Sequence, residues 1–184
     1  MPPRASACFE QGKGQEIIFE RPTPADGPAI SALIAACPPL DRNSAYCNLL
    51  QCTDFADSCI VARQDGTALG WVSGYRPPAA RENFFVWQVA VSAAARGQRL
   101  AGRMIDALLA RPEQGGVTYM TTTITSDNDA SWRLFEGLAR RWNAAVEKHP
   151  RFERETHFAG AHATEWQVRI GPLASPAQAS GDLS

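Results

Sequence analysis

A short turn rich in arginine and glycine follows an apolar segment near the middle of the chain. The apolar run VWQVAV ends at Val91, and SAAARGQRLAGRMIDALL comes directly after it. Between a buried strand and a helix, such a turn aims unpaired backbone N–H groups and the positive end of the helix dipole at one point. This arrangement cradles a pyrophosphate group without a dedicated side chain. An ordinary strand–helix turn, in which Gly97 only eases the bend, is the competing interpretation.

The segments around this turn alternate between strand and helix patterns. Apolar runs predict strands over residues 16–22, 58–63, 68–76, 84–91, 117–125 and 164–170. Helical spacing predicts helices over 25–37, 44–55, 98–111 and 128–142, with Ser44 or Asn43 and Asp127 or Asn128 as candidate caps. Asp65-Gly66 predicts a tight hairpin between the second and third strands. The sequence therefore predicts an α/β fold in which a mixed sheet carries helices on both faces.

The length and charge of the chain exclude several classes of protein. With 184 residues, and 18 basic against 19 acidic side chains, we expect one domain over residues 16–173 and no nucleic-acid partner. Residues 1–15 and 174–184, rich in Gly, Pro and polar side chains, are expected to be mobile extensions. No apolar run of about 18 residues and no signal peptide are visible, so no membrane association and a cytoplasmic location are expected.

The five cysteines show no spacing typical of a metal site. They are Cys8, Cys37, Cys47, Cys52 and Cys59, without a C-x-x-C pair or a histidine at ligand spacing. We expect reduced cysteines that behave as small buried apolar residues, and no bound metal.

The arginine-glycine turn resembles motif A of the GCN5-related N-acetyltransferase family, whose loop reads R/Q-x-x-G-x-G/A between a central strand and a helix. The corresponding residues are Arg96, Gly97, Gln98, Arg99, Leu100 and Ala101. The first and last positions match, whereas Arg99 replaces a glycine that lets the backbone approach phosphates or adopt a conformation disfavoured by a Cβ. One strand later, Asn128, Ser131, Leu134 and Phe135 fall on the N-x-x-A-x-x-L-Y pattern of motif B.

The resemblance implies the fold of that family, a mixed and mostly antiparallel twisted sheet with helices on both faces, and acetyl-CoA as the co-substrate. It places the six loop residues at the pyrophosphate, with Asn128 and Phe135 near the pantetheine arm. The backbone of Val89 and Val91 would pair with pantetheine as with an added strand. Phe135 stands where the family has a tyrosine that protonates the CoA thiolate, so that proton is left to Tyr46 or to water, or is not needed before release.

The segments CPPLDRNSAYCNLLQC and VSGYRPP are more particular, because they resemble the members of the family that acetylate L-2,4-diaminobutyrate in ectoine biosynthesis. This resemblance extends from about Phe19 to Leu173. It implies acetyl transfer to the γ-amine, giving Nγ-acetyl-diaminobutyrate for the formation of an osmoprotectant. A substrate with two ammonium groups and a carboxylate requires acidic partners, a cation and an aromatic wall.

We take Asp41, Tyr46 and Trp87 as the substrate-site candidates. Asp41 and Tyr46 lie where the family places its acceptor-binding helices, and Trp87 lies on the central strand. Capping of a turn by Asp41 and core packing of Trp87 are the alternatives. Arg42 and Arg76 are candidates to hold the carboxylate, against solvated surface roles.

The reaction needs a base, since an amine with a pKa near roughly 10 arrives protonated. ERETHFAGAHATE contains two of the three histidines, in the region that the family places beside the acceptor. His162 and Glu165 are the first candidates, and Glu155 and His157 the second, with solvated loop positions as the alternative. An acetyltransferase for a polyamine or lysine, and a CoA-binding module without catalysis, are the competing functions. A homodimer is also compatible with the apolar last strand.

Overall fold

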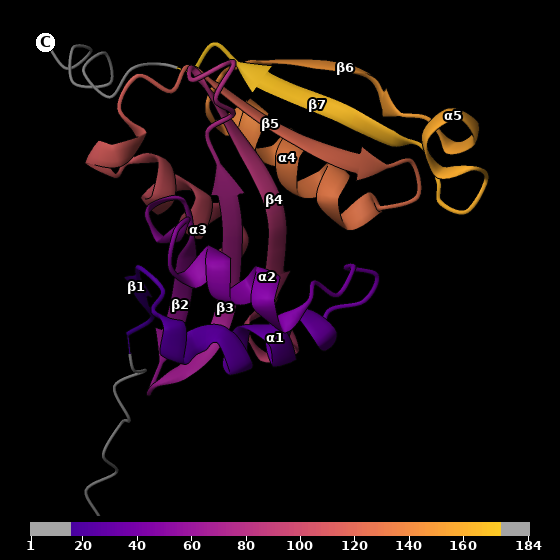
Figure 1. Cartoon of the computed structure of the whole chain (residues 1–184). Helices are drawn as coiled ribbons and strands as arrows, with labels where there is room; N and C mark the ends of the chain where they lie inside the picture. Colours follow the sequence, from indigo (N-terminus) through magenta and orange to yellow (C-terminus); the bar gives the residue numbers. More distant parts are fainter. Residues whose placement is uncertain (1–15, 174–184) are drawn as a thin grey trace, which may run out of the picture.

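The computed structural model describes residues 16–173, so the mobile extensions expected at 1–15 and 174–184 lie outside the described residues. Seven strands form one sheet in the order β1-β2-β3-β4-β5-β7-β6 (Figure 1). The strands are β1 (Ile18–Glu20), β2 (Ile60–Gln64), β3 (Thr67–Tyr75), β4 (Asn83–Val91), β5 (Tyr119–Thr125), β6 (Ala145–Phe152) and β7 (Glu165–Gly171). The helices are α1 (Gly27–Ala35), α2 (Ala45–Cys52), α3 (Leu100–Leu109), α4 (Asp129–Arg141) and α5 (Arg154–Phe158).

The two faces of the sheet are covered by different helices, as the sequence predicts. The larger core joins α3 and α4 to the sheet through buried side chains such as Met104, Leu138 and Val86. The smaller core packs α1 against Val61 and Trp71 on the other face. Most neighbouring strands are antiparallel, and only β4 and β5 run parallel. The predicted α/β fold and the mostly antiparallel sheet are confirmed.

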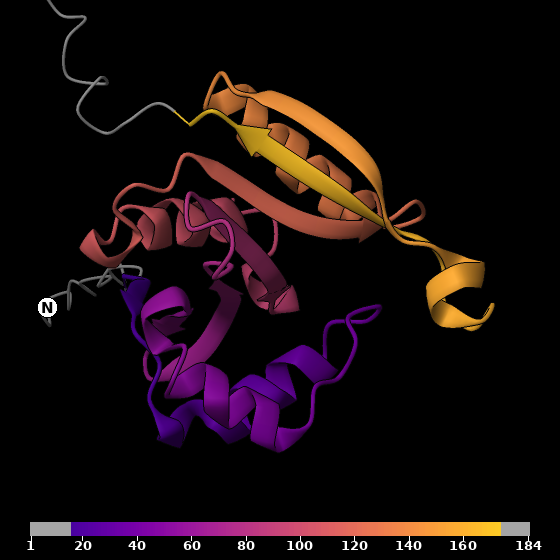
Figure 2. The same ribbon diagram turned by 45° about the horizontal axis from the view of Figure 1, so that its top comes forward.

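Strands β4 and β5 touch only at their beginnings. The register pairs Asn83, Phe84 and Phe85 with residues 119–121 of β5, and no further pair of these two strands follows. Figure 2 shows the strands diverging beyond this point. The remainder of β4 therefore keeps β3 as its only strand neighbour within the described residues.

The predicted hairpin forms at the expected place. Strands β2 and β3 pair up to Gln64 opposite Thr67. The two residues between them, Asp65 and Gly66, both have positive φ angles, 52° and 76°. This is the backbone of the tight turns that match the right-handed twist of paired strands.

The C-terminal region contains two elements that the sequence patterns do not predict. Strand β6 is AVEKHPRF, in which almost every residue is exposed because β6 is an edge of the sheet. An edge strand with little buried surface has no reason to alternate apolar and polar side chains. Helix α5 spans only residues 154–158, too few for a periodic pattern.

The helix predicted over residues 44–55 is shorter in the structure, because α2 ends at Cys52, before the exposed Phe55.

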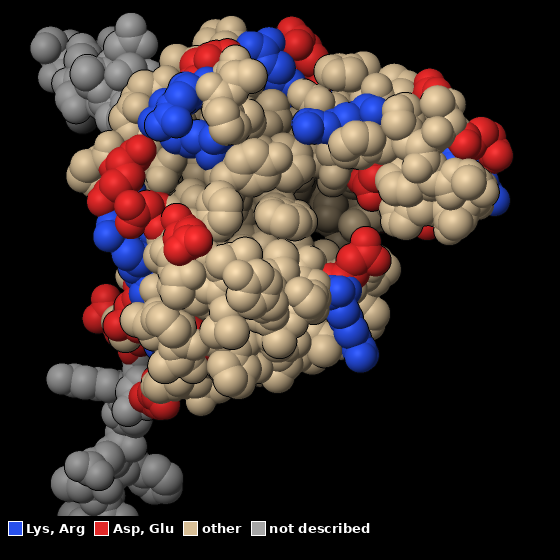
Figure 3. Space-filling model, in the orientation of Figure 1, with Lys and Arg blue, Asp and Glu red and all other residues tan. Residues whose placement is uncertain are grey.

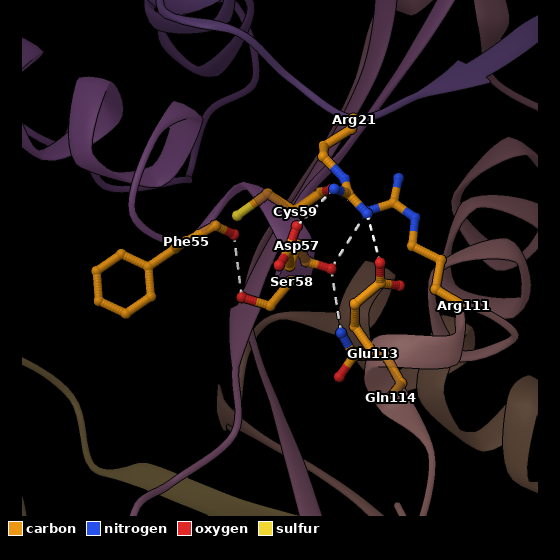
Figure 4. Close-up of polar contacts among 8 residues, drawn as sticks. All are labelled: Arg21, Phe55, Asp57, Ser58, Cys59, Arg111, Glu113 and Gln114. Carbon is orange, nitrogen blue, oxygen red and sulfur yellow. Dashed lines mark hydrogen bonds and ion pairs between the residues drawn. The ribbon is translucent and has the colours of Figure 1, made fainter.

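A polar cluster, shown in Figure 4, connects the end of β1 to the turns before β2 and after α3. Arg21 forms ion pairs with Asp57 at 2.9 Å and with Glu113 at 2.7 Å. Arg111 donates to the backbone oxygen of the buried Cys59 at 2.7 Å. These contacts hold the edge of the sheet opposite to β6.

The four described cysteines are free, and Cys8 lies outside the described residues. Cys37, Cys52 and Cys59 are buried, as expected of small apolar side chains, whereas Cys47 is only half-buried. Burial raises the pKa of Cys59 to about 12 and that of Cys52 to about 11, so both thiols stay protonated at neutral pH. Within residues 16–173 no group of His, Cys, Asp and Glu side chains could hold a metal ion. No helix in the same range is long and apolar enough to cross a membrane.

Candidate active site

The opening between β4 and β5 begins at Val86. The Thr122 hydroxyl of β5 donates to the Val86 backbone oxygen at 3.0 Å, which closes the paired part of the two strands. Beyond it, Val89 and Val91 are half-buried and pair with Val72 and Gly70 of β3. On the side of β5 no strand follows them within the described residues. An extended chain that added its own backbone pairs would fit beside these residues.

The last four residues of the turn between β4 and α3, Arg96 to Arg99, are exposed, and α3 begins at Leu100. The Leu100 side chain is 2% exposed, and Ala101 is half-buried, so both can offer only backbone N–H groups to a ligand at this end of the helix. Gly97 has a φ angle of +79°, and a Cβ built on it would meet no atom within 4 Å. Its need for glycine is therefore conformational.

Arg99 adopts the left-handed conformation, with φ 55° and ψ 24°. A non-glycine residue pays a conformational cost of about 1 kcal/mol or more there. This backbone explains physically why glycine suits the position, and it shows that an arginine can occupy it. The Arg99 side chain makes no hydrogen bond or ion pair to another described residue, so its guanidinium is available to an anion.

Two of the motif B residues, Asn128 and Phe135, have structural roles. Asn128 is the N-cap of α4, where its side-chain oxygen accepts from the Ser131 N–H at 3.1 Å. Phe135 is 3% exposed and belongs to the larger core. The Phe135 ring therefore forms part of the floor beneath β4 and β5 and presents little surface to a ligand.

A β-bulge in β4 places Trp87. Ser73 pairs with Gln88 and Gly74 pairs with Val86, which leaves Trp87 as the extra residue between them. The Trp87 side chain is 47% exposed instead of packing in the core. A Cβ at Gly74 would lie 2.5 Å from the Phe85 backbone oxygen, so glycine is required where the strands approach most closely.

Trp87 is one of three aromatic rings that form a wall at the point of divergence. The Tyr75 ring lies 5.2 Å from that of Phe85 and 6.3 Å from that of Trp87, measured between centroids. The guanidinium of Arg151, from β6, lies 5.4 Å from the Phe85 centroid. This wall connects the central strand with the C-terminal part of the sheet.

Asp41 and Tyr46 lie beside the same strand. The Asp41 backbone oxygen accepts from the Gln88 side chain at 2.7 Å, and the exposed Asp41 carboxylate makes no described hydrogen bond or ion pair. Ser44 caps α2 by accepting from the Cys47 N–H at 3.1 Å, which confirms one of the two predicted caps. Tyr46, in the first turn of α2, is 70% exposed.

The two arginines considered for binding the substrate carboxylate differ in whether their guanidinium groups already have partners. Arg76 donates to the backbone oxygens of Arg81, Glu113 and Gly115, so its guanidinium is used to hold the adjoining turns. Arg42 is exposed and has no hydrogen bond or ion pair within the described residues. Of the two, Arg42 alone is free to meet a carboxylate.

His162 and Glu165 are brought together at the start of β7. His162 Nε2 lies 4.0 Å from a Glu165 carboxylate oxygen, and its Nδ1 contacts the Ala163 backbone oxygen at 2.8 Å. Because a carbonyl oxygen only accepts, Nδ1 carries the hydrogen in this contact, and Nε2 is left to take a proton. Nearby, a hydrogen bond from the Thr125 side chain lowers the pKa of Asp127, with a smaller contribution from His162.

The second pair of candidates lies on α5, whose Phe158 ring packs 4.7 Å from that of His162. His157 Nδ1 accepts from the Glu153 N–H at 2.9 Å, inside the short helix α5. Glu155 pairs with Arg154 and lines a shallow cavity together with Pro150 and Trp166. Trp166 and Glu165 are neighbours along β7, so their side chains point to opposite faces of the sheet. Glu155 is thus separated from Glu165 by the sheet.

Figure 3 shows the surface hollowed between the lobe that carries α5 and the surface over α1 and α2. Arg151 connects the aromatic wall with β7, because besides its contact with Phe85 it donates to Gln167, two residues beyond Glu165, at 3.1 Å. Sequence patterns did not single out Tyr75, Phe85, Gln88 or Arg151. The available signal was Gln88, the one uncharged polar side chain within the apolar run FFVWQVAV.

Residues 28–139 match the sequence pattern of the acetyltransferase (GNAT) family. The chain belongs to this family, and its splayed central strand and exposed strand–helix turn are consistent with that membership. A protein of Methylotuvimicrobium alcaliphilum named L-2,4-diaminobutyric acid acetyltransferase is 46% identical over 85% of this chain and 91% of its own length. A protein of the same name from Halomonas elongata is 46% identical over 85% of this chain and 82% of its own length.

Solved structures agree with these relatives. A diaminobutyrate acetyltransferase from Paenibacillus lautus, in complex with L-2,4-diaminobutyric acid and coenzyme A, has a TM-score of 0.83 and 34% identity. The match covers 88% of this chain and 98% of that one. The ribosomal-protein-S18-alanine N-acetyltransferase of Escherichia coli, with a TM-score of 0.64 and 12% identity over 92% of this chain and 99% of its own, shares the fold.

Proposed function

We propose that the protein transfers the acetyl group of acetyl-CoA to the γ-amine of L-2,4-diaminobutyrate, giving Nγ-acetyl-diaminobutyrate, and that this is a step of ectoine biosynthesis. The observation that carries the proposal is the 46% identity to relatives named for this substrate, over nearly their whole length. The structure adds a site whose charges and rings suit a small dication with one carboxylate.

The co-substrate fits the opening between β4 and β5. The backbone of Val89 and Val91 would pair with the amide groups of the pantetheine arm, and Asn128 would contact the arm from α4. The backbone N–H groups from Gly97 to Ala101 would surround the pyrophosphate, with Arg96 and Arg99 supplying positive charge. The reacting thioester would then lie between Val86 and Val89, where the strands diverge.

The acceptor would lie in the hollow on the other side of this point. Asp41 supplies a carboxylate for an ammonium group, and the faces of Trp87 and Tyr46 attract cations by about 0.5–2 kcal/mol. Arg42 supplies a free cation for the substrate carboxylate. Anchoring the α-amino and carboxylate end in this way would leave only the γ-amine within reach of the thioester, which selects it by position.

Glu165 and His162 would remove the proton that the γ-ammonium carries at neutral pH. His162 Nε2 has its lone pair available, and Glu165, 4.0 Å away, would stabilise the imidazolium formed. Backbone N–H groups of β4 near Val89 would stabilise the negative charge that develops on the acetyl oxygen, an effect worth roughly 3–4 kcal/mol. Since Phe135 has no hydroxyl, protonation of the thiolate falls to Tyr46 or to water.

Two further expectations belong to this proposal. Strand β6 leaves one edge unpaired within the described residues, and Val146 and Phe152 on it are 44% and 38% exposed. This edge supports a homodimer. The co-substrate and the small polar acceptor are consistent with a cytoplasmic enzyme that needs neither a membrane nor a nucleic acid.

A substrate panel tests the proposal. Purified protein is given acetyl-CoA and equal concentrations of L-2,4-diaminobutyrate, 1,3-diaminopropane, putrescine or lysine, and thiol release is measured. We expect diaminobutyrate to be the preferred acceptor by at least tenfold in kcat/KM. A preference for a simple diamine or lysine would reject this substrate. Binding of acetyl-CoA without thiol release on any amine would indicate a module without catalysis.

A further inference from the structure

Gln88 is a buried polar residue in the strand that divides the two halves of the site. It is 6% exposed, although its neighbours along β4, Trp87 and Val89, are exposed and half-buried. A buried amide is costly unless both its oxygen and its nitrogen are satisfied. Every hydrogen bond that the Gln88 side chain makes within the described residues goes to one segment, residues 41–43.

Both ends of the Gln88 amide are used. Its nitrogen donates to the Asp41 backbone oxygen at 2.7 Å, and its oxygen accepts from the Asn43 side chain at 2.7 Å. Asn43 also donates to Asn48 of α2 at 3.2 Å. The amide therefore joins β4 to the segment that contains Asp41 and leads into α2.

A second contact attaches the beginning of the same segment. The Cys37 thiol, after α1, donates to the Val91 backbone oxygen at 3.3 Å. Residues 37–43 are thus attached to β4 at Val91 and at Gln88. The attachment at Gln88 is the one nearest to Trp87, and it is made by the residue that follows the bulge.

We infer that Gln88 is a positioning residue for the acceptor, which sets Asp41 and the start of α2 at a fixed distance from Trp87 and the acetyl group. This inference rests on the proposed function and deepens it. Gln88 itself is buried and acts through the residues that it holds. One route is through Asp41, and the other is through Asn43 and Ser44 to Tyr46. A small rotation of residues 37–43 would move the Asp41 carboxylate away from the substrate ammonium group that it is proposed to bind.

The test compares Gln88→Met with Ser31→Ala. Methionine keeps the length of glutamine but removes both hydrogen bonds. Ser31 accepts from Asn48 at 2.7 Å at the far end of the same network, so its replacement disturbs α1 and α2 without touching the link to β4. The measurements are KM for diaminobutyrate, the Kd of acetyl-CoA by calorimetry, and Tm.

We expect Gln88→Met to raise KM for diaminobutyrate at least tenfold, with the Kd of acetyl-CoA changed less than twofold, and Ser31→Ala to change both less than twofold. A lower Tm with an unchanged KM would mean that Gln88 is only structural and would overturn the inference. If Gln88→Met does not fold, Gln88→Glu, which keeps the oxygen that accepts from Asn43, must still raise KM at least threefold.

A double variant tests the route of the effect. On an Asp41→Asn background, where one of the two proposed substrate contacts is already weakened, adding Gln88→Met should change the Kd of diaminobutyrate by a smaller factor than it does in the wild type, because only the route through Tyr46 is left. If the fold-changes in Kd of the two single substitutions simply multiply in the double variant, action through Asp41 is contradicted. If the wild-type protein does not acetylate diaminobutyrate, the proposed function fails together with this inference. A wild type that is active, beside a Gln88→Met variant with normal KM, overturns this inference alone.

Discussion

Single residues of the candidate site have backbone conformations that bear on their proposed roles. Trp87 is exposed between the buried Val86 and Gln88, at the bulge of β4, and Arg99 lies in the left-handed region in the turn before α3. In both cases the backbone decides where the side chain can act. The same logic separates His162, with a free Nε2, from His157, whose Nδ1 is occupied within α5.

The proposed base is tested by two matched pairs of variants. Glu165→Gln and His162→Gln should each lower kcat at least 50-fold, because removal of the ammonium proton requires this pair. Glu155→Gln and His157→Gln, of the same residue types within 10 residues, should stay within twofold of the wild type. The measurement is steady-state thiol release at saturating acetyl-CoA. A loss in the second pair that equals the loss in the first would contradict the assignment.

The conformation of Arg99 gives a stability prediction. Arg99→Gly removes the Cβ from a position with φ 55° and should raise the free energy of unfolding by up to about 1 kcal/mol. It should also weaken acetyl-CoA binding, since the guanidinium is lost. Gly97→Ala, at φ +79°, should lower stability by about 1 kcal/mol. Denaturant unfolding measures both, and a destabilised Arg99→Gly would show that the side chain packs favourably.

Asp26 links stability to pH. Burial alone would raise the pKa of its carboxyl group, but the Thr23 N–H and Arg63 outweigh this and lower it below 3.8. The carboxylate therefore stabilises the fold at all pH values above 3.8, and this contribution is lost as the pH falls through the lowered pKa. Asp26→Asn should cost about 1–2 kcal/mol at pH 7, and the difference from wild type should shrink below pH 3.8. An equal difference at pH 7 and pH 2.5 would contradict this.

At the scale of elements, the cap of α2 connects stability to the site. Ser44→Ala removes the hydrogen bond to the Cys47 N–H and should cost about 1 kcal/mol. KM for diaminobutyrate should also rise, because Tyr46 lies in the first turn of this helix. Ser58→Ala is the control, since that hydroxyl donates to the Phe55 backbone oxygen within its own turn. Equal KM values for Ser44→Ala and wild type would show that the first turn is held by other contacts.

Elements with a buried face were predictable from sequence, and exposed ones were not. The apolar run of β4 and the stripe of α3 correspond to strands and helices in the structure, because burial imposes their patterns. Strand β6 carries no such pattern, since it is exposed at an edge. For the candidate site, motif spacing indicated Arg96–Ala101 and Asn128 as candidates, whereas the proposed role of Gln88 depends on a contact across 47 residues that no local pattern records.

At the scale of the whole molecule, the two halves of the sheet carry different parts of the proposed site. The half from β1 to β4 lies beside residues 37–43, which are proposed to bind the acceptor, and the half from β5 to β6 carries His162 and Glu165, the proposed base. The two halves meet along the short β4–β5 ladder, through the helices and at the contact of Arg151 with Phe85. The proposed co-substrate, lying between them, would join the halves and stabilise the fold.

The proposed position of acetyl-CoA between the two halves predicts how ligand binding changes the free energy of unfolding. Acetyl-CoA at about 100 times its Kd should raise the free energy of unfolding by about 2.7 kcal/mol, and Tm should rise with its concentration. Diaminobutyrate alone should give a smaller increase, because its contacts lie mostly on the acceptor side. Thermal unfolding at several ligand concentrations measures this, and an unchanged Tm at saturating acetyl-CoA would contradict binding to the folded state.

The most direct test of the central claim is the identity of the nitrogen that is acetylated. Purified protein is incubated with acetyl-CoA and L-2,4-diaminobutyrate, and the product is examined by NMR. The account predicts that the acetyl group is on the γ-nitrogen, with the α-amine free. Acetylation at the α-nitrogen, or no product while another amine is acetylated, would contradict it.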